Sequence, residues 1–162
     1  MLHRYRPLVA AVWSAAIPGF GQMYNRQLGK AVIFIVLEVL INDKSHLNTA
    51  IFYSWLFQIQ SAQQSIDYQW LLFYPCFYIY AIYDAYHFCC NRLRIAEPAG
   101  IVVPFVVTWL LGTVSVIFSS GQRVFYGLER IGPVFLGVLV ILVCLVGGCW
   151  LVVWRSRRKG LP

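Results

Sequence analysis

Two carboxylates, Glu38 and Asp84, stand inside strongly apolar stretches of the sequence. A charged side chain in hydrocarbon costs a few kcal/mol, so each carboxylate should face other helices and find a partner there. Glu38 lies about 8 residues after Lys30, and Asp84 lies about 7 residues before Asn91, which places both at a depth of roughly 10–12 Å at 1.5 Å per residue. The shared depth predicts that the two carboxylates are neighbours.

Buried carboxylates of this kind suit three kinds of chemistry. They can accept hydrogen bonds from N–H groups that a broken helix leaves free, carry a proton or cation, or act as a catalytic acid and base. We expect the first role, because the sequence places a broken helix nearby. The proton or cation pathway and the catalytic pair stand as alternatives.

His87 follows Asp84 by three residues and so lies on the same helical face. With Glu38 these side chains would form a minimal metal site, but no second histidine supports it. We predict a hydrogen-bonded histidine instead, with no metal and no other cofactor. The sequence also lacks a serine nucleophile elbow, a zinc motif and a glycine-rich phosphate loop, so we expect no enzymatic activity.

The broken helix belongs to the amino-terminal segment. Leu8 to Ile17 is an apolar stretch of about 10 residues, roughly half of what a membrane crossing requires. Pro18 should end its helix, and Gly19 and Gly21 permit the positive φ of a sharp turn. We therefore predict a re-entrant or interfacial hairpin over residues 7–30, with the motif residues Pro18, Gly19, Gly21, Gln22, Tyr24 and Asn25. A buried polar cluster of Glu38, Asp84, His87 and Arg26 is expected to lie against it.

The composition indicates an all-α integral membrane protein. The chain is 60% apolar with a mean hydropathy of +0.67, against roughly 45–50% apolar residues in soluble domains. Its net charge of +7 comes from basic residues dispersed in short flanks, which favours contact with anionic lipid over nucleic-acid binding. The five cysteines form no disulfide framework, and we expect them to pack as small apolar side chains. Palmitoylation or redox chemistry at Cys89 and Cys90 is the alternative.

Four transmembrane helices follow the hairpin in this interpretation. A motif-bearing half, residues 1–95, contains crossings at 31–47 and 68–90, joined by an amphipathic surface helix at about 47–66. A carboxyl-terminal hairpin, residues 96–162, contains crossings at 101–119 and 133–154. Asp67 should cap the second crossing, and Pro75 should kink it.

The distribution of lysine and arginine predicts the orientation. If the hairpin does not cross, Arg26 and Lys30 lie on the same side as Arg4 and Arg6. The other basic residues on this side are Arg92, Arg94, Arg155, Arg157, Arg158 and Lys159. Both termini are then cytoplasmic. The first 21 residues also have the pattern of a secretory signal, but we expect this segment to be retained, since the Pro-Gly turn suits a hairpin.

The motif from Pro18 to Asn25, followed by Asp84-Ala85-Tyr86, resembles that of small bacterial membrane proteins related to the TM2-domain family. A similar hairpin occurs near the amino terminus of some sugar-type ABC transporter permeases. This chain has Arg26 where a glycine is common and Gly29-Lys30 where Lys-Gly is usual. The resemblance covers about the first 95 residues. It implies a hairpin in the bacterial cytoplasmic membrane, and no particular reaction.

We therefore expect a scaffold or accessory subunit of a membrane complex. Its partners would be the lipid bilayer and either a membrane protein or a second copy of this chain. The alternative is a transporter component or small-solute conduit that uses Glu38 and Asp84. A packed interior with hydrogen-bonded carboxylates would favour the scaffold, and a polar cavity open to one side would favour the conduit.

Overall fold

The computed structural model describes residues 6–120, 143 and 145–154, and these form helices joined by short turns, with no strand among them. The all-α prediction is confirmed for this part of the chain. Within the same residues, no helix combines the length and the hydropathy that a membrane crossing demands. The helices are α1 (Arg6–Ala16), α2 (Phe20–Tyr24), α3 (Leu28–Ser45), α4 (Leu47–Trp55), α5 (Ile59–Ser65), α6 (Tyr68–Leu71), α7 (Phe73–Leu93) and α8 (Val102–Ser120), and residues 145–154 are helical as well.

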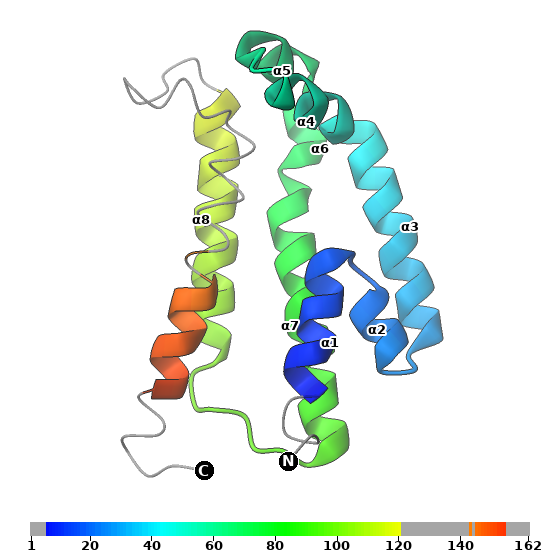
Figure 1. Ribbon diagram of the computed structural model, residues 1–162, viewed down its shortest axis with the longest axis vertical. Coiled ribbons are helices and arrows are strands. Elements are labelled where there is room, and N and C mark those ends of the chain that lie inside the picture. The colour runs from blue at the N-terminus through cyan, green and yellow to red at the C-terminus, as the bar shows by residue number, and fades with distance from the viewer. Residues whose placement is uncertain (1–5, 121–142, 144, 155–162) are drawn as a thin grey trace.

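Helix α7 is the centre of the packing. It contacts α1, α2 and α3 on one side and α8 on the other, as Figure 1 shows. Buried side chains of α1 and α7, Ala10, Ala85 and Cys89, form one small core. A second core joins Ile79 and Ile82 of α7 to Ile101 and Phe105 at the start of α8. Because α7 is shared by both cores, its side chains are the ones most able to connect the two halves of the chain.

The amino-terminal segment is a hairpin, as the motif predicts. Helix α1 ends at Ala16, just before Pro18, and Gly19 adopts a left-handed φ of 106°. Gly21 does not share this conformation; it lies inside α2. Arg26, with a φ of 62°, makes a second turn into α3. The chain thus returns to the end where α1 begins.

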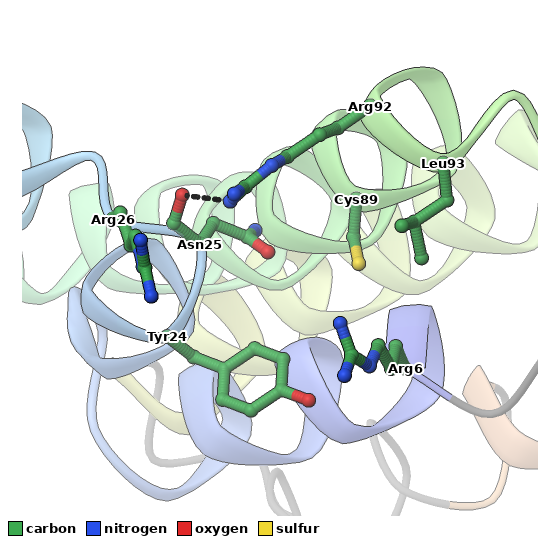
Figure 2. Close-up of a pocket in the computed structure, with 7 residues that line it drawn as sticks. All are labelled: Arg6, Tyr24, Asn25, Arg26, Cys89, Arg92 and Leu93. Carbon is green, nitrogen blue, oxygen red and sulfur yellow. Dashed lines mark hydrogen bonds between the residues drawn. The ribbon is translucent and has the colours of Figure 1, made fainter. Parts of the chain in front are cut away.

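One pocket shows this return directly. Arg6 at the start of α1, Arg26 after α2 and Arg92 near the end of α7 line the same pocket (Figure 2). A hairpin that crossed to the far end would separate Arg26 from Arg6. The described basic residues of the hairpin therefore gather at one end of the helices.

The interval 47–66 differs from the prediction of a single amphipathic helix. It contains α4 and α5, separated at Phe57, which has a left-handed φ of 58°. The amides of Phe57 and Gln58 donate to the carbonyls of Ser54 and Tyr53, at 3.1 and 2.9 Å. These bonds satisfy the last carbonyls of α4, so the helix stops although no glycine or proline marks the position.

The crossing predicted at 68–90 is also divided, into α6 and α7 around Leu72. Pro75 has no N–H to donate to the carbonyl of Leu71, which accounts for the interruption. Asp67 caps α6 as predicted, its Oδ1 accepting from the amides of Gln69 and Trp70 at 2.9 and 3.4 Å. Helix α7 then runs to Leu93, a little beyond the predicted end.

Helix α8 occupies the interval predicted at 101–119. Of the segment predicted at 133–154, only residues 143 and 145–154 are described, and the rest lies outside the described residues. A Cβ added to Gly148 would lie 2.6 Å from the Cβ of Pro104. This close approach fixes the last described helix against α8.

Candidate functional site

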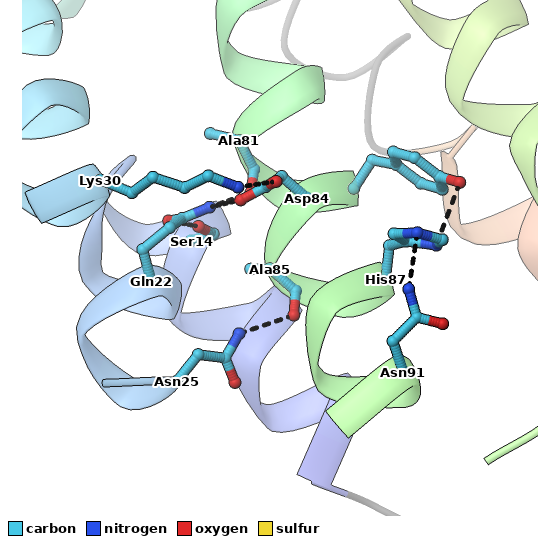
Figure 3. Close-up of polar contacts among 10 residues, drawn as sticks. Ser14, Gln22, Asn25, Lys30, Ala81, Asp84, Ala85, His87 and Asn91 are labelled. Atoms are coloured by element: carbon cyan, nitrogen blue, oxygen red, sulfur yellow. Dashed lines mark hydrogen bonds and ion pairs between the residues drawn. The ribbon is translucent and has the colours of Figure 1, made fainter. Parts of the chain in front are cut away.

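The hairpin is attached to α7 by side chains that we call the polar seam: Ser14, Gln22, Asn25, Lys30 and Asp84, with the carbonyls of Ala81 and Ala85. Gln22 is its centre and is fully buried. Its Oε1 accepts from Ser14 Oγ at 2.9 Å, and its Nε2 donates to the Ala81 carbonyl at 2.9 Å and to Asp84 Oδ2 at 3.1 Å (Figure 3). One amide therefore ties α1, α2 and α7 together.

Asn25 repeats this contact one helical turn further along. Its Nδ2 donates to the Ala85 carbonyl at 2.8 Å, and its backbone carbonyl accepts from Arg92 Nη1 at 2.9 Å. Ala81 and Ala85 lie four residues apart, so their carbonyls fall on one face of α7. The spacing of Gln22 and Asn25 in the motif matches that face, which explains why the motif contains two amide side chains.

The seam requires small residues, because the backbones come very close. Ala10, Ala81 and Ala85 are completely buried. A Cβ added to Gly21 would clash with the Ala10 carbonyl and would lie 2.7 Å from the Cβ of Ala85. Small residues four apart on a helix allow a second helix to approach this closely.

Asp84 accepts from two donors of the hairpin region. Oδ2 accepts from Gln22, and Oδ1 pairs with Lys30 Nζ at 2.6 Å; the Asp84 side chain is 11% exposed and that of Lys30 is 45% exposed. The prediction that Asp84 faces the hairpin is thus confirmed for Gln22. Lys30 was missed, although its place in the first turn of α3 was a usable signal once α3 and α7 are taken as antiparallel.

Two other predicted donors to Asp84 lie elsewhere. Asn25 donates to the Ala85 carbonyl instead. Arg26 is exposed and lines the pocket of Figure 2, so its membership of a buried cluster was wrong. Its left-handed backbone conformation, which ends α2, directs this residue away from the seam.

Glu38 is not a neighbour of Asp84, contrary to the depth argument. Its Oε1 accepts from Tyr74 Oη at 2.8 Å, in the first turn of α7. The antiparallel register of α3 and α7 pairs Lys30 with Asp84 and Glu38 with Tyr74, so the carboxylates lie at different levels. The two helices do not end at one plane, because α7 extends well past the start of α3. Glu38 Oε2 is buried and has no hydrogen-bond partner among the described residues.

His87 also lies apart from Asp84. Its Nδ1 is 2.8 Å from Glu97 Oε1, and its Nε2 is 2.9 Å from Asn91 Nδ2. The loop after α7 folds back and brings Glu97 to this face, an interaction that helical spacing alone does not reveal. The predicted cluster of Glu38, Asp84, His87 and Arg26 is therefore divided among four places. In the described part of the chain, no three potential ligands converge on a metal site.

No family model, curated protein or solved structure matches this chain. The resemblance to TM2-domain proteins stays a prediction.

Proposed function

We propose that this chain is a polytopic, non-enzymatic protein of the bacterial cytoplasmic membrane that serves as a scaffold or accessory subunit of a membrane complex. The observation that carries the proposal is the use of the polar seam. Gln22 and Asn25 of the hairpin donate their side-chain hydrogen bonds to α7, and Asp84 of α7 accepts one of them. Interior polar groups committed to helix packing suit a structural role better than a reaction.

Exposed apolar faces support the membrane location. On α3, the side chains of Val32, Ile33, Val36 and Val39 are each about 60% exposed and lie on one side of the helix. Helix α8 carries a similar row that includes Val103 and Leu110. Contiguous apolar surface of this kind is typical of contact with lipid or with another protein.

The positions of the basic residues support an orientation. Arg6, Arg26 and Arg92 lie at one end of the helices, and Lys30 is in the adjacent first turn of α3. The bias of lysine and arginine toward the cytoplasmic side then makes this end cytoplasmic.

A conduit is the second candidate, and one observation favours it. Glu38 Oε2 is buried without a partner among the described residues, as an acceptor for a proton or cation would be. The pocket of Figure 2 contains neither Glu38 nor Asp84, however. Glu38 and Asp84 also have different partners, Tyr74 and Lys30, at different levels of α3 and α7, so the scaffold is the better account.

Affinity purification from native membranes, followed by mass spectrometry, tests the scaffold. We expect one membrane protein, or a second copy of this chain, to co-purify in fixed stoichiometry. Val36→Trp keeps the α3 face apolar but changes its shape and should reduce the yield of that partner. Gln60→Trp, which adds the same ring at an exposed position of α5, is the control. Equal recovery with both variants would contradict a role for the α3 face.

Purified protein in liposomes tests the conduit. The scaffold predicts no proton or cation flux above that of empty liposomes. A flux that the parent supports and Glu38→Gln abolishes would overturn the scaffold in favour of the conduit.

A further inference from the structure

A pocket of about 310 Å³ lies between the hairpin and the end of α7. The start of α1, the turn after α2 and the end of α7 each contribute an arginine: Arg6, Arg26 and Arg92. Tyr24, Asn25, Cys89 and Leu93 complete its lining. Figure 2 shows the side chains of Arg6 and Tyr24 below those of Arg26 and Arg92, around the same space.

The lining has an uncompensated positive charge. Among the described residues, it contains three guanidinium groups and no carboxylate. The carboxylates nearest in sequence are used elsewhere, since Asp84 pairs with Lys30 and Glu97 contacts His87. Like charges brought together repel one another, so an anion in the pocket would lower the free energy of this arrangement.

The Arg92 guanidinium is held in position by the hairpin. Arg92 donates one N–H to the Asn25 carbonyl at 2.9 Å, and its remaining N–H groups can serve another acceptor. Arg26 adopts a left-handed φ of 62°, which is sterically unfavourable for any residue other than glycine. Glycine would adopt this conformation without the steric penalty. Arginine at this position differs by contributing a guanidinium group to the pocket.

We propose that this pocket binds a phosphate group, supplied by the headgroup of an anionic phospholipid. Arginine donates paired N–H groups that match phosphate oxygens. Tyr24 and Leu93 provide apolar surface beside the charges, which suits a headgroup attached to acyl chains better than a free ion. The lipid source rests on the proposed membrane location; the phosphate site itself does not.

Thermal unfolding of the full-length protein in a nonionic detergent, at fixed ionic strength, tests the site. The additives are short-chain phosphatidylglycerol, short-chain phosphatidylcholine and inorganic phosphate. We expect phosphatidylglycerol to raise the unfolding midpoint in a saturable way, with a smaller effect of phosphatidylcholine. Arg26→Gln and Arg6→Gln should each weaken the apparent affinity about tenfold, the usual effect of losing a charged hydrogen bond.

Arg94→Gln is the matched control. Arg94 is also exposed, belongs to the same end of α7 and has a similar left-handed φ of 53°, but it does not line the pocket. Its variant should bind as the parent does. Equal weakening by Arg94→Gln and Arg26→Gln, or no response to phosphatidylglycerol and phosphate, would overturn the site. A response to phosphate alone would retain the anion site and overturn the lipid source. Neither result depends on partner recovery, so the scaffold is tested separately.

Discussion

At the scale of residues, Gly21 sets the distance between the hairpin and α7. Because an added Cβ would meet backbone of α1 and the side chain of Ala85, Gly21→Ala should destabilise the protein by about 1–3 kcal/mol. Gly29→Ala is the control, since nothing lies within 4 Å of its Cβ position and it is helical. The free energy of unfolding of that variant should equal that of the parent or exceed it by up to about 1 kcal/mol. Thermal unfolding in detergent measures both, and equal midpoints would refute the close approach.

Asp84 provides the second residue-level prediction. Asp84→Ala leaves Gln22 without its acceptor and should cost about 1–3 kcal/mol. Asp84→Asn retains an acceptor oxygen and loses mainly the ion pair with half-exposed Lys30, so its cost should be smaller. Asp43→Asn, at an exposed position of α3, should change little. If Asp84→Asn abolished a measurable activity while the unfolding midpoint stayed constant, Asp84 would be a functional carboxylate rather than a structural one.

The contact between Gln22 and Asp84 could be predicted from sequence, and the rest of the cluster could not. The motif contains the amide donor of Gln22, and the later apolar stretch contains the acceptor Asp84. Because buried polar groups need hydrogen-bond partners, these two residues could be paired without a structure. The partners of Glu38 and His87 depend on the register of α3 against α7 and on the fold of the loop that carries Glu97. Neither is encoded in local spacing.

At the scale of elements, the hairpin depends on two turns of left-handed backbone, at Gly19 and Arg26. Arg26→Gly should raise stability by up to about 1 kcal/mol, because glycine adopts this conformation without steric cost. Arg26→Gln also removes the charge but keeps the left-handed conformation of a non-glycine residue, so it is the reference for Arg26→Gly. An Arg26→Gly midpoint below that of Arg26→Gln would contradict this account of the turn.

The breaks between helices show which signals a sequence carries. Those at Pro18 and before Pro75 follow from a missing N–H, and both could be predicted. The break at Phe57 could not, since an aromatic residue in a left-handed conformation gives no local signal. The large exposed side chains around it, Phe52, Trp55 and Leu56, were predicted to form one helix with Ile59 and instead flank the turn.

In the whole molecule, the proposed membrane orientation requires the two ends of the helices to lie on opposite sides of the bilayer. The hairpin and the pocket arginines mark one end, and α4 and α5 lie at the other, at the top of Figure 1. Composition predicted the apolar character of the chain, and the exposed faces of α3 and α8 are its structural counterpart. The arrangement of helices around α7 required the structure, because similar apolar segments do not specify their neighbours.

The most direct test of this account is cysteine accessibility at the two ends, in a background where the native cysteines are replaced. Arg26→Cys reports on the hairpin end, and Gln60→Cys reports on α5. With a membrane-impermeant maleimide, residue 60 should label from the outer side of the cytoplasmic membrane, and residue 26 should label only after that membrane is permeabilised. Labelling of residue 26 from the outer side, or equal labelling of both positions in intact cells, would contradict the proposed membrane scaffold.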